Sequence, residues 1–250
     1  MSDTSELVPF RARHAPNPFD PRNNADAFEI RLLLRPSDLS DALRLRHRAY
    51  ADHGHVPHID GAEYRDAHDD YPTTALFGAY DDGRLVACMR LCFSMSGDDL
   101  AALPCAPYYP ALAGIAANAP HGFVEVSRLA IEPGIGNTSY RATLYGYMVR
   151  AALAAARAAG VSRIVVATRP DWVATYKHLL SFEQVGEPAL YPPGDIPITL
   201  LSGNLEDASK RAFMRNRFFR VSDGDIALMR RLLSPILHPI QAAVATASTR

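Results

Sequence analysis

The stretch FVEVSRLAI, residues 123–131, carries three polar side chains inside a run of apolar and β-branched residues that predicts a strand. These are Glu125, Ser127 and Arg128. An alanine-rich helical segment follows, which is typical of a central strand in an α/β sheet. A carboxylate in such a strand is costly unless a cation or hydrogen bonds hold it. Glu125 therefore belongs either to a structural ion pair or to a functional site.

Arg90 is the cation that the sequence offers to Glu125. It shares a strand face with Cys88 and Cys92 in RLVACMRLCFS, so it is expected to point inward. In a regular strand Arg128 faces away from Glu125, and both serve one cleft only if a β-bulge turns one of them. Two interpretations stay open. One is a structural Glu125–Arg90 pair, and the other is a general base at Glu125, whose pKa burial raises and arginines lower.

The elements that must position these residues begin with a strand at 28–35 and an amphipathic helix, for which Pro36 and Ser37 are start signals and which ends near Gly54. A polar loop follows, and a loop of about twenty residues in a compact domain is usually functional. Two strands joined at Asp81-Asp82-Gly83 form a predicted hairpin. A connection rich in Pro, Ala and Gly, residues 97–121, leads to the strand described above.

Strands and helices continue to alternate after that strand. Asn137, Thr138 or Ser139 can cap a helix that Gly160 ends, and it is followed by a strand at 163–168, a helix at 171–182, a strand region at 189–202 and one or two more helices. This order predicts an α/β fold with a mixed central β-sheet flanked by helices. We divide the chain into a flexible leader, a main domain and a C-terminal helical extension with a tail: residues 1–27, 28–202 and 203–250.

Four motifs occur in an order that resembles the GNAT superfamily of N-acyltransferases. They are LRLRHRAYADHGHV with Arg46 and Tyr50, EYRDAHDDY, GRLVACMRL with Arg90, and EVSRLAI with Glu125 and Arg128. Within the superfamily they resemble the acyl-homoserine-lactone synthases and the long-chain N-acyl amino acid synthases. The segment RPDWVATYKHLLSFEQVGEPALYPPGDIP leans toward the second group, and the resemblance covers roughly residues 28–202.

The resemblance implies a GNAT-like acyltransferase fold with extra C-terminal helices, a bulge in strand 123–131, and a gap beside strand 163–168 for a thioester arm. It implies transfer of a long-chain fatty acyl group from an acyl carrier protein or coenzyme A thioester to the amine of an amino acid. The thioester is a co-substrate, and no further cofactor is expected. The alternatives are an acyl-homoserine-lactone synthase that uses S-adenosylmethionine and a non-catalytic acyl-thioester-binding module.

Two departures from the family patterns bear on the substrates. The phosphate loop is reduced to EPGIGNTSYR, which favours a donor held by more than its nucleotide. The tryptophan expected in the N-terminal loop of homoserine-lactone synthases is missing, because Trp172 is the only tryptophan of the chain. S-adenosylmethionine is therefore the less expected acceptor.

The resemblance also implies roles for individual residues, and Glu125, Arg128 and Arg90 are the expected catalytic ones. An amino acid carries an ammonium and a carboxylate, so the residues that bind it are expected to combine arginine with carboxylates. The candidates are Arg46, Tyr50, Asp66, Asp69 and Asp70. The sequence does not tell which of Asp69 and Asp70 is the site residue. The thioester arm and its phosphate are expected to lie against strand 123–131 and the start of the helix that follows it. The residues expected to bind them are Ser127, Leu129, Ala130, Asn137, Thr138, Ser139 and Arg141. The structural alternatives are a solvated loop with salt bridges and an ordinary capped helix.

A cluster of positive charges lies in SKRAFMRNRFFR, interleaved with phenylalanines. Acyl carrier proteins are acidic, so four of these residues are predicted to dock one: Lys210, Arg211, Arg215 and Arg217. Arg220 adds a fifth charge. A packed helix with a solvated basic face is the simpler interpretation, and an anionic membrane surface would be attracted by the same charges.

The composition excludes several protein classes. A formal net charge of -1 argues against a general binder of nucleic acid. Three cysteines without a CxxC motif predict no disulfide framework, and neither a signal pattern nor a membrane-spanning run is present. A cytoplasmic enzyme is the expectation, with peripheral membrane contact left open.

Two rival chemistries have candidate residues. Non-haem iron would use the histidines and the aspartate of DHGHVPHID, which are His53, His55, His58 and Asp60. Such a site also needs a third ligand from elsewhere and a barrel of strands, and the sequence does not supply them. We expect no metal. A cysteine nucleophile at Cys88 or Cys92 would lie inside an apolar strand, where a small buried hydrophobic role is the better interpretation.

Overall fold

The structure is a computed structural model that describes residues 28–95, 100–119, 121–192 and 196–247, with side chains described as far as residue 237. The leader predicted at 1–27 lies outside the described residues. Among the helices of the described part, none is long and apolar enough to cross a membrane.

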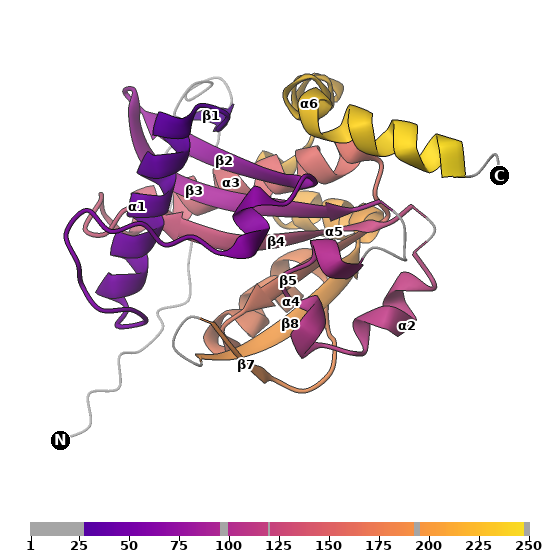
Figure 1. Cartoon of the computed structure of the whole chain (residues 1–250), viewed down its shortest axis with the longest axis horizontal. Coiled ribbons are helices and arrows are strands. Elements are labelled where there is room, and N and C mark those ends of the chain that lie inside the picture. The colour runs from indigo at the N-terminus through magenta and orange to yellow at the C-terminus, as the bar shows by residue number, and fades with distance from the viewer. Residues whose placement is uncertain (1–27, 96–99, 120, 193–195, 248–250) are drawn as a thin grey trace.

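Eight strands of the described residues form one mixed sheet in the order β1-β2-β3-β4-β5-β8-β6, and β7 pairs with β8 off this path (Figure 1). β4 and β5 run parallel, whereas the other paired strands are antiparallel. The mixed central sheet predicted from the sequence is therefore confirmed. The strands are β1 (Glu29–Leu32), β2 (Thr74–Asp81), β3 (Arg84–Ser94), β4 (Phe123–Ile131), β5 (Arg163–Thr168), β6 (Glu183–Gln184), β7 (Ala189–Tyr191) and β8 (Ile196–Asn204).

Helices cover both faces of this sheet (Figure 1). On one face α3, α5 and α6 share a large apolar core with strand residues such as Phe77 and Val124. On the other face α1 packs over one half of the sheet, and the segment that contains α2 packs over the other half. The α-helices are α1 (Pro36–Asp52), α2 (Leu112–Ala116), α3 (Thr138–Ala159), α4 (Val173–Leu180), α5 (Leu205–Arg215) and α6 (Asp223–Ala247), and the 3-10 turns are η1 (Ala67–Asp70), η2 (Leu100–Ala102), η3 (Ala106–Tyr108), η4 (Pro170–Trp172) and η5 (Arg217–Phe219).

Local signals account for the hairpin and for the longest helix of the first 200 residues. The turn between β2 and β3 has positive φ angles at Asp82 (47°) and Gly83 (78°), which matches the right-handed twist of the strands. At α3 the side chain of Asn137 accepts a hydrogen bond from the Tyr140 backbone N–H at 3.0 Å, and Gly160 ends the helix with a φ of 77°. The predicted hairpin and helix caps are confirmed.

Two segments differ from the prediction. The connection at 97–121 contains η2, η3 and α2, because its apolar side chains bury themselves against the sheet, although its many Pro and Ala residues hide any periodicity. The single strand region at 189–202 is two strands, β7 and β8, since the segment turns back on itself and pairs Ala189 with Ile198.

β4 and β5 pair at only four positions and then separate. The paired residues run from Phe123–Arg163 to Val126–Val166, although β4 continues to Ile131 and β5 to Thr168. The last residues of β5 pair instead with β8. The gap between these strands that the family resemblance implied is confirmed, and it opens beside the polar residues of β4.

Candidate active site

A β-bulge in β4 turns Arg128 toward the face that carries Glu125. The register pairs Cys88 with Ala130 and Arg90 with Ser127, so β4 has one more residue than β3 over this stretch. Arg128 has a φ of +56°, a left-handed conformation that is uncommon outside glycine. The bulge is therefore confirmed, and it lets Glu125 and Arg128 serve one site.

The 3-10 turn η1 presents two carboxylates to this face. Asp66 caps the turn by accepting the His68 backbone N–H at 3.0 Å, while Asp69 Oδ2 accepts the Asp66 backbone N–H at 2.9 Å. This reciprocal arrangement is a capping box, which fixes both side chains relative to the turn. The aspartate spacing in the sequence therefore sets how the two carboxylates point.

Three arginines bind these two carboxylates. Arg46 Nη1 lies 2.8 Å from Asp69 Oδ2, and Arg90 Nη1 lies 2.5 Å from Asp66 Oδ1 and 3.0 Å from Asp69 Oδ1. Arg128 Nη2 lies 2.8 Å from Asp66 Oδ2. We call these five residues the arginine–aspartate cluster. Three cations against two anions leave the cluster with one excess positive charge.

The arginines control the protonation of both aspartates. Burial by itself would raise the pKa of Asp66, but the charges and hydrogen bonds of Arg90 and Arg128 outweigh it and hold the pKa well below its usual range. The pKa of Asp69 is likewise lowered, against its burial, chiefly by Arg46. Both groups are therefore carboxylates at neutral pH.

Glu125 lies beside this cluster but is not paired with it. Its side chain is fully buried, and its Oε2 accepts the Cys105 backbone N–H at 2.9 Å. Burial raises the pKa of Glu125, although the hydrogen bonds from Cys105 and the charge of Arg90 oppose the shift. Among the described residues Oε1 has no hydrogen-bond partner. The Glu125–Arg90 ion pair that the sequence left open is not formed, since Arg90 binds the aspartates instead.

Aromatic rings surround the guanidinium of Arg128. Its Cζ lies 5.1 Å from the ring centre of Tyr64, 5.7 Å from that of Tyr191 and 5.9 Å from that of Tyr50. Its Nη1 also donates to the Pro192 carbonyl at 3.2 Å. Arg128 keeps 8% of its side-chain surface exposed, whereas Arg46 and Arg90 keep none. Arg128 is therefore the cation of the cluster that a ligand can reach.

Comparisons with known proteins address the family of this chain. A family model described as N-acyl amino acid synthase FeeM matches residues 41–204, which hold the arginine–aspartate cluster and Glu125. The chain belongs to the FeeM N-acyl amino acid synthase family. It is accordingly an acyl-transferring enzyme, and the alternative of a non-catalytic binding module does not stand.

Solved structures agree with the FeeM family assignment at the level of the fold. FeeM itself, an N-acyl amino acid synthase from uncultured soil microbes, is 18% identical with a TM-score of 0.58, covering 76% of this chain and 96% of its own. The acyl-homoserine-lactone synthase LasI is 18% identical, with a TM-score of 0.55 and coverages of 75% and 94%. A coenzyme A-dependent acyl-homoserine-lactone synthase, BjaI, is 19% identical, with a TM-score of 0.52 and coverages of 78% and 91%. The predicted GNAT-like acyltransferase fold is confirmed. A search of curated proteins gave no match.

The residues expected to bind the acceptor divide into two groups in this FeeM-family enzyme. Tyr50 lies against the cluster, and Asp66 and Asp69 belong to it, so their contacts with an acceptor stay a prediction. Asp70 lies outside it, because the 3-10 turn points its side chain toward solvent, where it pairs with Arg65. Arg46 is in the cluster but is fully buried and bound to Asp69, so it positions that carboxylate.

We expect Asp69→Asn and Asp70→Asn to differ in stability. The first leaves Arg46 and Arg90 facing a neutral amide in a buried place, which should lower the free energy of unfolding by about 2–3 kcal/mol. The second removes an exposed ion pair, and such pairs contribute little. Urea unfolding of both variants checks this, and equal losses would contradict the placement of the two side chains.

The residues expected to hold the thioester arm lie along the gap between β4 and β5 and at the start of α3. Ser127 accepts a hydrogen bond from Arg90 Nε at 3.3 Å, and Leu129 and Ala130 follow the bulge. At the helix start Asn137, Thr138 and Ser139 are exposed, while Arg141 donates to the Glu132 carbonyl at 3.3 Å. Their contacts with a thioester stay a prediction.

The predicted carrier-docking residues lie elsewhere. Lys210, Arg211 and Arg215 are on α5 and Arg217 is in η5, and α5 packs on the sheet face opposite Glu125. Lys210 pairs with Glu206 at 2.7 Å, and Arg211 donates to the His178 carbonyl at 3.3 Å. The structure therefore separates this basic segment from the arginine–aspartate cluster.

The geometry of the described residues bears on the two rival chemistries, a metal site and a cysteine nucleophile. Over the described residues, no three His, Cys, Asp or Glu side chains are grouped so that they could hold a metal ion. Burial raises the pKa of Cys88 to about 11 and that of Cys92 to about 12, so both thiols stay protonated at neutral pH and are poor nucleophiles.

Sequence reasoning missed three residues of the site. Cys105 comes from the connection before β4, whose composition carried no chemical signal. Tyr64 stands inside the EYRDAHDDY motif, two residues before Asp66, and this proximity was an available signal. Tyr191 comes from β7, which was not predicted as a separate strand.

Proposed function

We propose that this FeeM-family enzyme forms an amide between a long-chain acyl thioester and a free amino acid. The observation that carries the proposal is a fully buried carboxylate, Glu125, held by a backbone N–H beside a cluster with an excess positive charge. A buried carboxylate with a raised pKa is suited to act as a general base, and an excess positive charge is suited to bind an anionic substrate.

Glu125 acts as the general base in this proposal. The amine nitrogen attacks the thioester carbonyl carbon, so that a C–N bond forms and the C–S bond breaks. Glu125 takes the proton that the amine loses, directly or through water, and the departing thiolate takes up a proton. Because burial raises the pKa of Glu125, the carboxylate is a stronger base than an exposed glutamate. No covalent enzyme intermediate and no further cofactor are needed.

Arg128 receives the carboxylate of the acceptor. It is the cation of the cluster that remains partly exposed, and the rings of Tyr50, Tyr64 and Tyr191 hold its guanidinium in place. The excess charge of the cluster is neutralised when an anion binds there, which stabilises the buried ion pairs as well as the ligand. Arg90 and Arg46 position the aspartates behind it.

The thioester enters through the gap between β4 and β5. Backbone groups of Ser127, Leu129 and Ala130 follow the last paired residue, Val126, and are available to the phosphopantetheine arm. The start of α3 lies at the end of this gap, where its amides and Arg141 favour a phosphate. Acyl carrier protein and coenzyme A present the same arm, so either is a donor in this proposal.

Purified enzyme tests the proposal when it is given a long-chain acyl carrier protein thioester or the matching coenzyme A thioester with a mixture of amino acids. We expect release of free thiol and an N-acyl amino acid in the mass spectrum. A parallel reaction contains S-adenosylmethionine. If an acyl-homoserine lactone were the only product, the enzyme would be a homoserine-lactone synthase on the same fold.

The acidic limb of the pH profile of kcat/KM is expected to report the pKa of Glu125, and a substitution of the neighbouring Cys105 is expected to move that limb. The base must be deprotonated, so the rate should fall as pH drops below the raised pKa of Glu125. In Cys105→Ala the carboxylate loses the neighbouring thiol, whose side chain lowers the pKa of Glu125, so that pKa should rise further. We expect the acidic limb to move up by about half a pH unit.

Cys105→Ser is the matched control for this shift. A hydroxyl replaces the thiol as hydrogen-bond donor, so the acidic limb should return to the wild-type position or move below it. An identical upward shift in both variants would mean that packing, and not the hydrogen bond, sets the pKa.

A further inference from the structure

The outer face of α5 and η5 carries a concentration of positive charge. Around it stand six cationic side chains and two carboxylates, a net charge of +4 in a chain whose total is -1. Its acidic members are Glu206 and Asp207 in the first helical turn. We call this the basic face, and its cations are Arg157, Lys210, Arg211, Arg215, Arg217 and Arg220.

Large apolar side chains are exposed among these cations. Met214 keeps 77% and Phe213 keeps 42% of its surface exposed, on the side of α5 opposite to Ala208 and Ala212, which are buried in the core. Exposed apolar groups inside a charged patch are typical of a surface that meets a partner. Electrostatics alone therefore does not describe this face.

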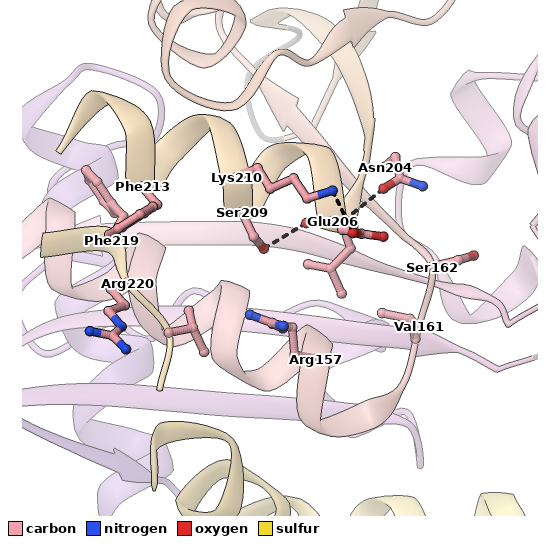
Figure 2. Close-up of a pocket in the computed structure, with 12 residues that line it drawn as sticks. Arg157, Val161, Ser162, Asn204, Glu206, Ser209, Lys210, Phe213, Phe219 and Arg220 are labelled. Carbon is pink, nitrogen blue, oxygen red and sulfur yellow. Dashed lines mark hydrogen bonds and ion pairs between the residues drawn. The ribbon is translucent and has the colours of Figure 1, made fainter. Parts of the chain in front are cut away.

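A cavity of about 560 Å³ adjoins the basic face (Figure 2). It lies between the end of α3, the start of α5 and the segment after η5. Its apolar walls include Val161, Leu205 and Phe219, and its cations are Arg157, Lys210 and Arg220. Figure 2 shows Arg157 and Arg220 on one side of the cavity and Phe213 and Phe219 near its edge. Glu206 also lines the cavity and pairs with Lys210 at 2.7 Å, so Arg157 and Arg220 are the lining cations that give the cavity its excess positive charge beside the apolar walls.

The position of the basic face argues against delivery of a carrier-protein arm. α5 packs on the sheet face opposite to Glu125, and the cavity is lined by Ser162 and Asn204, which flank the paired ends of β5 and β8. The gap between β4 and β5 opens at the other end of these strands, beyond Val166. An arm that started on this face would have to pass around the sheet to reach Glu125.

We infer that the basic face docks the enzyme on a bilayer that contains anionic phospholipids. The arginines would lie at the phosphates, Phe213 and Met214 would enter the boundary between headgroups and acyl chains, and the cavity would accept a headgroup. The gap between β4 and β5 then stays open to the donor. This inference depends on neither the donor nor the acceptor proposed above.

Co-sedimentation with vesicles tests the inference on the full chain. One set of vesicles contains equal parts of phosphatidylglycerol and phosphatidylcholine, and the other contains phosphatidylcholine alone. We expect binding to the first set that weakens as salt is raised. Each basic residue near such a surface changes partitioning about fivefold, so Arg215→Gln, Arg217→Gln and Arg220→Gln together should reduce it by about 10².

The matched control neutralises three arginines on other parts of the molecule, the exposed Arg35 and Arg84 and the partly buried Arg44. It has the same net charge as the first variant, and it should bind vesicles nearly as well as the wild type. A second variant, Phe213→Ser with Met214→Ser, keeps every charge and should lose the part of the binding that survives high salt.

Three results would overturn the inference. The first variant could bind vesicles as the wild type does, or the control could lose as much binding. The first variant could also raise KM for the carrier-protein thioester alone, with vesicle binding unchanged, in which case the face docks the carrier protein. Circular dichroism of each variant confirms that the comparison is made between folded proteins.

Discussion

Glu125→Gln is expected to lower kcat by about 10² to 10⁴, the range usual for the loss of a general base, while the protein stays folded. Glutamine has the shape of glutamate, and its carbonyl oxygen can still accept the Cys105 N–H that now binds Oε2 at 2.9 Å. It cannot take a proton from the amine. Since the glutamate is fully buried with a raised pKa, removing its charge should not destabilise the fold.

Steady-state kinetics and thermal unfolding of the same preparation measure both effects. The double variant Glu125→Gln with Cys105→Ser serves as a control, because two substitutions acting through one proton transfer should not add. If the Glu125→Gln variant unfolds, yet keeps its specific activity in the folded fraction, Glu125 has a structural role instead.

Arg90→Ala is expected to lower the free energy of unfolding by about 3–5 kcal/mol, the cost typical of removing one partner from a buried ion pair. The arginine is fully buried and binds Asp66 and Asp69 at once. Without it the excess charge of the cluster changes from +1 to 0, but each aspartate keeps only one guanidinium. Activity should fall as well, since Asp66 also holds Arg128.

The pH dependence separates this mechanism from a simple loss of packing. In the wild type the arginines lower the pKa of both aspartates, so their ion pairs stabilise the fold above the unfolded value near pH 4 and stop doing so as pH falls through the folded values. The variant lacks part of this stabilisation at neutral pH. The difference between the two proteins in free energy of unfolding should therefore narrow as pH falls below about 4.

Arg90→Met is the packing control, because it fills a similar volume without the charge. If it were as stable as the wild type at neutral pH, the loss in Arg90→Ala would come from the cavity left behind and not from the uncompensated carboxylates.

Most of the fold could be predicted because its signals are local. A two-residue turn at Asp82 and Gly83, and caps at Asn137 and Gly160, each act within a few residues. The connection before β4 lacks such signals. Its short helices are stabilised by contacts with the sheet, which the sequence does not express as a period.

In the candidate site, too, residues with a local signal could be predicted, whereas contacts between distant segments could not. Arg90, Glu125 and Arg128 stand out because charged residues in apolar strands are rare. Their partners depend on the path of the long loop, so the sequence offered Arg90 to Glu125 where the structure pairs it with Asp66 and Asp69. The phase of one 3-10 turn separates Asp69 from Asp70, and no pattern in the sequence carries that phase.

The bulge in β4 has a consequence for how sequences of this family are aligned. The site requires one residue more in β4 than in β3 between the pairs Arg90–Ser127 and Cys88–Ala130, so its geometry is encoded in a count of residues as well as in their types. An alignment that places a gap of one residue between Glu125 and Arg128 would still match the apolar residues on one side of the gap. It would shift the arginine to the opposite face of the sheet. The interval of two residues between Glu125 and Arg128 should therefore be kept free of gaps.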